Sequence, residues 1–264
     1  MNDSFILPDT IESLSLADRL VAHRGYASRY PENSLLAVER ALHHGARFIE
    51  VDIQLTADAQ PVLYHDRDMK RLSGAENAVH LLTYDELNRY SLHNPVVFGD
   101  RFADEPIAHL QQLINLMLMH PRVTFFIEFK RVALENFGLE QTLKATLPLL
   151  ELVRHQAVLI SYSEGMVKAA AEQGWRTGMV MDHFPERDWH SRFPVSPEFL
   201  FLDYNDIGTR IIQEEKQHWP GISLALFEVT DAVDAQSWLL QGADLVETFA
   251  IGAARKAMQS VAQI

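Results

Sequence analysis

Short apolar runs rich in β-branched and aromatic residues alternate along the chain with longer stretches whose apolar residues recur at helical spacing. After the first run, for example, Leu35, Val38 and Leu42 fall near one face of a predicted helix, which Gly45 ends. This alternation is typical of βα units around a parallel sheet. The predicted strands number eight and span residues 20–25, 48–56, 123–130, 157–163, 176–182, 199–205, 222–230 and 244–249. Eight such strands suit a closed α/β barrel.

One further apolar run, at residues 61–66, does not fit the alternation. It follows the second strand after a connection too short for a parallel crossover, so we expect it to pair with that strand as a hairpin. Residues 67–106 contain no long periodic run, and we interpret them as an excursion over the barrel mouth. Because no repeat or linker composition divides the chain, we predict one domain over residues 1–264 with an insertion at about 67–106.

The formal net charge of −13 opposes non-specific binding to nucleic acid or to an anionic membrane. The absence of cysteine excludes disulfides and thiolate metal ligands. The first residues lack the basic and apolar regions of a secretory signal, and no stretch stays uncharged for about 18 residues. We therefore expect a cytoplasmic protein with no nucleic-acid partner and no stable membrane insertion. The sequence does not indicate an oligomeric state.

Acidic residues interrupt two of the predicted strands. Glu50 and Asp52 lie two positions apart, so both side chains face one way, at the strand ends where barrel enzymes build their sites. Two carboxylates this close repel each other unless a cation neutralises them, which suggests a hard divalent metal, Mg²⁺ or Ca²⁺. On the next strand, Glu128 can add a third oxygen ligand and Lys130 a positive charge. The alternative for these acids is a simple ion pair with a basic neighbour.

Two histidines end predicted strands on what topology makes the same rim of the barrel. His23 ends the first strand and His65 ends the hairpin strand. Imidazoles titrate near neutral pH, so this pair can supply a general base and a general acid, although each alone can equally be a structural residue. Arg24 follows His23 directly, and its planar guanidinium suits a phosphate or a carboxylate.

These elements together resemble the glycerophosphodiester phosphodiesterase family, whose signature joins HRG, PEN, E-x-D and HD. The matching residues here are 23–25, 31–33, 50–52 and 65–66, and "FFIEFK" at 125–130 resembles the family's IEIK. The resemblance implies a TIM (β/α)₈ barrel with a small inserted cap after the second strand. It also implies one divalent metal on Glu50, Asp52 and Glu128.

The resemblance implies roles for the remaining positions too. It assigns acid and base catalysis to His23 and His65, phosphate contacts to Arg24 and Lys130, and support by hydrogen bonding to Glu32 and Asn33. The expected reaction is hydrolysis of a small-molecule glycerophosphodiester, such as a deacylated phospholipid headgroup, to sn-glycerol 3-phosphate and an alcohol. Which histidine is the acid stays open, as does whether water or the glycerol's own hydroxyl is the nucleophile.

The second half of the chain departs from the family pattern. In "FEVTD", Phe227 stands where a tryptophan is common and Glu228 where a threonine is common. In "GADLVETFAIG", Asp244 and Glu247 are present without the usual Thr-Asp pair. An extra acid at the mouth either disfavours anionic substrates or pairs with a basic residue. The alternatives are therefore a related diesterase acting on lysophospholipids or another phosphodiester, and a non-catalytic phosphate-binding barrel.

Overall fold

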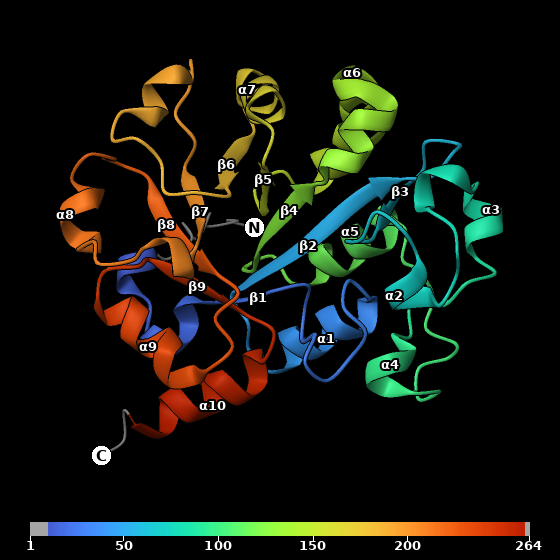
Figure 1. The fold of residues 1–264 in the computed structure, drawn as a ribbon, viewed down its shortest axis with the longest axis horizontal. Coiled ribbons are helices and arrows are strands. Elements are labelled where there is room, and N and C mark those ends of the chain that lie inside the picture. Colours follow the sequence, from blue (N-terminus) through green and yellow to red (C-terminus); the bar gives the residue numbers. More distant parts are fainter. Residues whose placement is uncertain (1–9, 262–264) are drawn as a thin grey trace, which may run out of the picture.

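The computed structural model describes residues 10–261, and its centre is a closed barrel of parallel strands surrounded by helices (Figure 1). The first strand pairs with both the second and the last, which closes the sheet into a TIM barrel. All eight predicted barrel strands are confirmed. They are β1 (Leu20–Ala22), β2 (Phe48–Leu55), β4 (Thr124–Phe129), β5 (Ala157–Ser161), β6 (Arg176–Met181), β7 (Phe199–Asp203), β8 (Ser223–Phe227) and β9 (Leu245–Thr248).

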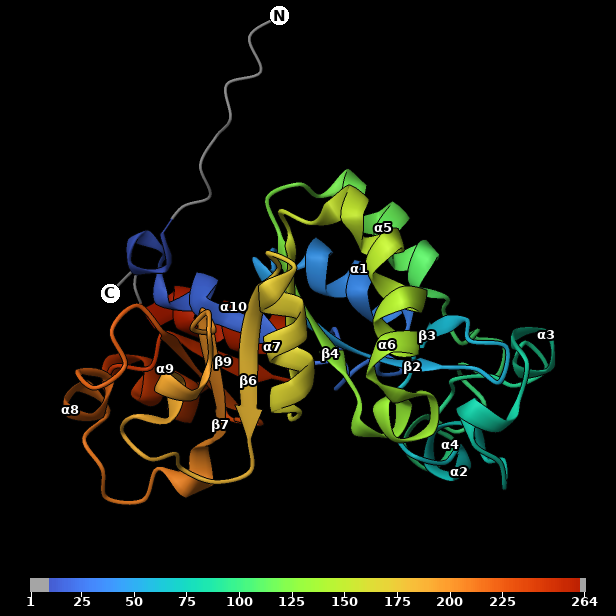
Figure 2. The same cartoon turned by 90° about the horizontal axis from the view of Figure 1, so that it is seen from above.

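Most of the longer helices pack around the outside of the barrel, as Figures 1 and 2 show. They are α1 (Leu35–His43), α5 (Leu110–Met119), α6 (Arg131–Leu150), α7 (Glu164–Glu172), α8 (Ile212–Lys216), α9 (Ala232–Leu240) and α10 (Ile251–Val261). Short 3₁₀ turns lie at η1 (Ile11–Ser13), η2 (Leu16–Arg19), η3 (Val79–Leu81), η4 (Glu151–Val153), η5 (Trp189–Arg192) and η6 (Tyr204–Asp206). Within residues 10–261, no helix combines the length and apolar character needed to cross a membrane.

The predicted hairpin is also present, since β3 (Pro61–Leu63) runs antiparallel to the upper end of β2, with Ile53 opposite Leu63. From there the chain forms the cap, a group of four-residue helices at one side of the barrel in both views (Figures 1 and 2). These helices are α2 (Lys70–Ser73), α3 (Tyr84–Leu87) and α4 (Pro95–Phe98). A separate apolar cluster that includes Tyr64, Met69 and Leu72 holds the cap together.

Two apolar layers support the barrel. One lies between the strands and the outer helices. The other lies inside the barrel, where the rings of Phe126, Phe199 and Phe201 pack edge to face at 4.9 and 5.0 Å. Because these rings fill the barrel interior towards the amino ends of the strands, polar side chains find room only at the carboxyl ends.

Candidate active site

A small pocket of about 60 Å³ opens above the aromatic layer at the carboxyl ends of the strands. It gathers candidates from strands that are far apart in sequence. Six of the nine predicted site residues line it: His23, Arg24, Glu50, His65, Glu128 and Lys130. Asp52, Glu32 and Asn33 lie just behind and are hydrogen-bonded or ion-paired to members of this group.

The three predicted metal ligands converge. Glu50, Asp52 and Glu128 are buried, and each offers a carboxylate oxygen that lies within 4.8 Å of the other two. The pairing of β2 with β4 explains this, because it sets Asp52 directly beside Glu128. Lys130 joins the group from the end of β4, with its Nζ 3.1 Å from Asp52 and 2.9 Å from Glu128.

The acid cluster holds more negative charge than its basic neighbours balance. Burial, followed by the nearby carboxylates of Asp52, Glu247 and Glu128, raises the pKa of Glu50 well above its usual range. Burial also raises the pKa of Glu128, although Lys130 opposes this. The buried Oε1 of Glu50 has no hydrogen-bond partner among the described residues. Hard oxygen donors, excess negative charge and an unpaired oxygen fit a divalent cation such as Mg²⁺ or Ca²⁺.

Asp52 behaves differently from the two glutamates. Burial alone would raise the pKa of Asp52, but the positive charge of Lys130 and other cations, with a hydrogen bond from Asn33, holds it well below its usual range. The amide of Asn33 donates to Asp52 Oδ2 at 2.8 Å and accepts from the Asp52 backbone N–H at 2.9 Å. Asp52 is therefore an oriented carboxylate, as a metal ligand needs to be.

His23 is buried in the pocket wall. Its ring stacks on Phe249 at 4.6 Å with an interplanar angle of 16°, and its Nε2 lies 3.7 Å from Glu50 and 3.9 Å from Glu247. Burial, together with the charge of Arg24, lowers the pKa of His23 well below its usual value. The imidazole is thus neutral near pH 7 and able to accept a proton.

His65 is more open to solvent, and a carboxylate orients it. Its Nδ1 lies 2.7 Å from Asp66 Oδ1, which leaves Nε2 for chemistry in the pocket. The same carboxylate of Asp66 is held by Arg71, whose Nε donates at 2.7 Å. The ring is therefore fixed by a carboxylate that is itself fixed.

Arg24 adopts a left-handed backbone conformation, with φ of 55°. Non-glycine residues rarely do so, and such strain is often found where a side chain must be aimed. The backbone N–H of Arg24 donates to Glu50 at 3.0 Å, and its Nη1 donates to Glu32 at 2.7 Å. Its Nη2 lies 3.5 Å from Glu228. Glu228, the acid at the end of β8 that departs from the family pattern, thus lies beside the basic side chain of Arg24.

The likeness to known proteins covers the residues that build this site. The model of the Glycerophosphoryl diester phosphodiesterase family matches residues 23–141, which hold every one of the nine predicted site positions. Over this stretch the chain is similar to the family.

Known glycerophosphodiester phosphodiesterases align with the chain over different lengths. A glycerophosphodiester phosphodiesterase of Caldanaerobacter subterraneus subsp. tengcongensis is 28% identical over 233 residues, which are 87% of this chain and 93% of that protein. One of Bacillus altitudinis is 32% identical over 126 residues, 48% of this chain and 51% of that protein, so the more similar stretch spans about half of that relative.

Solved structures share the barrel. A phosphodiesterase of Oleispira antarctica superposes with a TM-score of 0.79 at 20% identity, covering 91% of this chain and 96% of that one. A glycerophosphodiester phosphodiesterase of Thermotoga maritima gives 0.73 at 21% identity, covering 90% and 97%. At these identities the likeness establishes the fold.

The PEN segment of the family signature connects the barrel to the cap. Glu32 accepts from Arg24 at 2.7 Å and from the two terminal nitrogens of Arg71 at 2.7 and 2.8 Å. Arg71 belongs to α2 of the cap, so the carboxylate of Glu32 connects Arg24 to the insertion. Although burial raises it, the pKa of Glu32 is held below its usual value by these two guanidinium groups.

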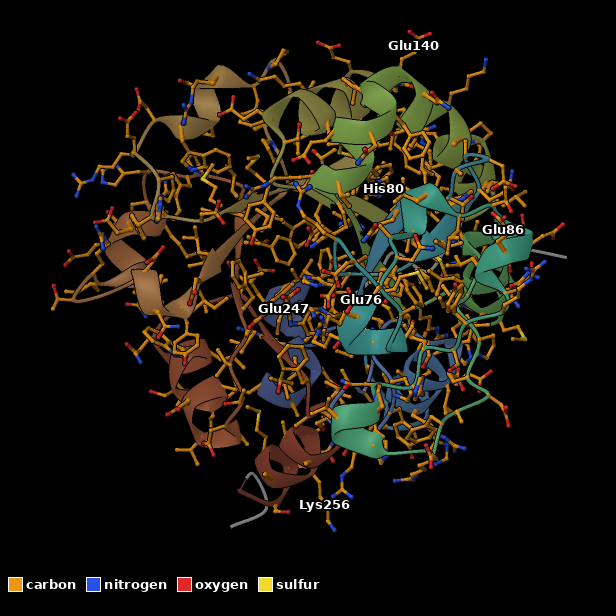
Figure 3. The ribbon with its side chains drawn as sticks, turned by 45° about the vertical axis from the view of Figure 1, so that its right-hand side comes forward. Glu76, His80, Glu86, Glu140, Glu247 and Lys256 are labelled. Atoms are coloured by element: carbon orange, nitrogen blue, oxygen red, sulfur yellow. The ribbon has the colours of Figure 1, made fainter. Side chains whose placement is uncertain are left out.

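Sequence reasoning left several site residues without a role. Phe249 stacks on His23, and Asp66 and Arg71 form the support of His65. Glu247 is 3% exposed and lines the pocket from β9; Figure 3 labels it towards the centre of the molecule. Its signal was an acid within an otherwise apolar strand. Asp244, by contrast, pairs with Lys216 Nζ and does not line the pocket.

Proposed function

We propose that the protein hydrolyses glycerophosphodiesters to sn-glycerol 3-phosphate and an alcohol. The observation that carries the proposal is that both histidines, two basic side chains and two of the three clustered acids line one pocket. The likeness of residues 23–141 to the Glycerophosphoryl diester phosphodiesterase family supports the reaction class. The Oleispira antarctica phosphodiesterase was solved in complex with the product sn-glycerol-3-phosphate, which is consistent with this product.

The basic groups would bind the phosphodiester. Arg24 and Lys130 can each donate to a non-bridging oxygen, and both are held in place by carboxylates. A divalent cation bound by Glu50, Asp52 and Glu128 would add Lewis-acid stabilisation of the charge that develops on those oxygens. Because the pocket is small and largely enclosed by Ile160, Val180 and Phe201 below, these charges act with little screening by water.

The two imidazoles would move the protons. Neutral His23 is suited to accept a proton from the attacking hydroxyl, either of water or of the substrate's glycerol. His65 is suited to protonate the leaving alkoxide, because the contact of its Nδ1 with Asp66 leaves Nε2 for the pocket. This division of roles is part of the proposal.

The test is a release assay for glycerol 3-phosphate from glycerophosphocholine and glycerophosphoethanolamine with Mg²⁺ or Ca²⁺. We expect His23→Ala and His65→Ala each to lower kcat by about 10²- to 10⁴-fold. His43→Ala is the matched control, since His43 is exposed on α1 and away from the pocket. Turnover of lysophospholipids alone would favour the related lipid diesterase. Phosphate binding without turnover under either metal would favour a non-catalytic barrel.

A further inference from the structure

A second, larger cavity opens beside the catalytic pocket, and we call it the cap groove. Its volume is about 680 Å³. Val97 and Phe98 of α4 line it from the cap, and Glu228, Thr230, Phe249 and Ala250 line it from the ends of β8 and β9. Arg24, His65 and Glu228 line both cavities, so the groove continues directly from the position proposed for the phosphate.

This arrangement separates the two halves of a diester. The catalytic pocket, at about 60 Å³, has room for little more than the reacting group, whereas the cap groove is large enough for an organic substituent. The proposed acid, His65, lies where the two meet. The oxygen that it would protonate belongs to the leaving alcohol, so the alcohol extends into the groove.

Most charges of the groove are already paired within the protein. Arg24 and Arg71 both donate to Glu32, and Arg71 also donates to Asp66. Glu228 differs, because its side chain is 50% exposed and its nearest basic atom, Nη2 of Arg24, lies 3.5 Å away, beyond a strong hydrogen bond. Its carboxylate can therefore meet a ligand.

A bound phosphodiester would bring its own negative charge to Arg24, next to Glu228. With a neutral alcohol, Glu228 and the phosphate would repel each other. If the alcohol carries an ammonium group a few bonds from phosphorus, the negative phosphate would meet Arg24 and the positive ammonium group would meet Glu228. Phe98 adds aromatic surface of the kind that favours quaternary ammonium groups, whereas the ring of Phe249 already contacts His23 and Arg24.

We propose that the cap groove binds the alcohol part of the substrate and that Glu228 selects alcohols bearing an ammonium group, such as ethanolamine or choline. This inference rests on the proposed function. It makes Glu228 a specificity-determining residue and assigns zwitterionic diesters as the preferred substrate class.

The test compares kcat/KM for glycerophosphoethanolamine and glycerophosphocholine with that for glycerophosphoglycerol, whose alcohol is neutral. In Glu228→Gln we expect the preference for the ammonium substrates to fall about five- to tenfold, and in Glu228→Lys to fall further. The neutral substrate should become a better one in Glu228→Gln, because the repulsion is removed. Glu172→Gln, on the exposed end of α7, removes the same charge far from the groove and should leave the ratio unchanged.

The outcomes separate this inference from the function on which it rests. Wild-type protein that hydrolyses none of the three diesters overturns the proposed function. Hydrolysis of all three with the same ratio in wild type and Glu228→Gln overturns only the role of the groove. An equal loss for every substrate in Glu228→Gln would mean that Glu228 positions Arg24, and this also overturns selection of the alcohol.

Discussion

Glu50 shows how a single side chain can link metal binding to stability. It is 1% exposed and lies among the carboxylates of Asp52, Glu128 and Glu247. Because burial and these charges raise its pKa, the folded, metal-free protein holds a proton there more tightly than the unfolded chain does. That contribution to stability is complete below the ordinary glutamate pKa and is lost as pH rises through the raised pKa.

We therefore predict that, in chelator, wild-type Tm falls as pH rises from the ordinary glutamate pKa through the raised pKa of Glu50, and that Glu50→Gln reduces this fall. At neutral pH the metal-free variant should be more stable by about 1 kcal/mol, or roughly 2–4 °C in Tm. Adding Mg²⁺ or Ca²⁺ at about 100 times Kd should stabilise the wild type by about 2.7 kcal/mol. The variant should gain much less. Equal metal-induced shifts in thermal unfolding of both proteins would contradict a ligand role for Glu50.

The residue-level site was predictable where chemistry and spacing coincide. Alternation along β2 placed Glu50 and Asp52 on one face, and strand order brought Glu128 beside them. The contact of Phe249 with His23 was not predictable, because an aromatic residue after an apolar strand looks the same whether it packs on a core or on an imidazole. Only barrel closure brings the two rings together.

At the scale of elements, the loop from β1 to α1 depends on Gly25. Its φ is +80°, and a Cβ there would lie 2.7 Å from the carbonyl carbon of Ala37 and 2.8 Å from the backbone nitrogen of Val38. Backbone hydrogen bonds hold this loop, which carries Arg24 and Asn33, against α1: the N–H of Tyr26 donates to the Ala37 carbonyl, and the N–H of Asn33 donates to the Arg24 carbonyl. A side chain at Gly25 would have to displace helix backbone, which has little freedom to move.

We expect Gly25→Ala to destabilise the protein by about 2–6 kcal/mol, the sum of left-handed strain and overpacking. Gly221→Ala is a matched control, because Gly221 has φ of +79° and a Cβ there would meet no atom of residues 10–261 within 4 Å. It should cost about 1–3 kcal/mol from strain alone. Urea unfolding of both variants measures the difference, and equal losses would show that the approach to α1 is not the limiting constraint.

The cap illustrates what periodicity does not reveal. The N-terminus of α3 is capped reciprocally, because the Thr83 side chain accepts from the Glu86 backbone N–H and the Glu86 side chain accepts from the Thr83 backbone N–H. α2 and α4 are only four residues long, too short for a helical pattern to appear. α2 is held by Leu72 in the apolar cluster of the cap and by the hydrogen bonds of Arg71 to Glu32 and Asp66.

At the scale of the whole molecule, Arg255 joins elements from both ends of the described chain. From α10 its guanidinium donates to the Ala17 carbonyl at 2.6 Å, to Asp18 at 2.8 Å and to the His44 carbonyl at 3.0 Å. It is 7% exposed. Removing the Arg255 side chain would leave these three oxygen acceptors without the donor that links α10 to the segments on either side of β1.

We predict that Arg255→Met, which keeps an apolar stem, lowers the free energy of unfolding by about 2–4 kcal/mol. Lys256→Met is the control, since Lys256 is exposed on the same helix and points outward in Figure 3. It should change stability by no more than about 0.5 kcal/mol. Equilibrium urea unfolding tests both, and a similar small effect in each would exclude Arg255 as a link between the two ends.

For the molecule as a whole, the sequence was sufficient to predict the barrel, because eight apolar strands with helices between them have few other ways to bury both faces. It was insufficient for the cap groove and its charges. Glu228 and Arg24 are separated by most of the chain, and their 3.5 Å contact depends on closure of the barrel, which brings the ends of β1 and β8 to either side of β9.

The stacking of Phe249 on His23 has a consequence for synthesis of the protein. The imidazole proposed as the base is made early, yet the ring that backs it is made only after β9, much later in synthesis. A translation product that stops before Phe249 would contain all nine candidate residues, but His23 would lack the aromatic ring that stacks on it. Nascent fragments would therefore be idle as enzymes, and activity would begin only once synthesis has passed this position.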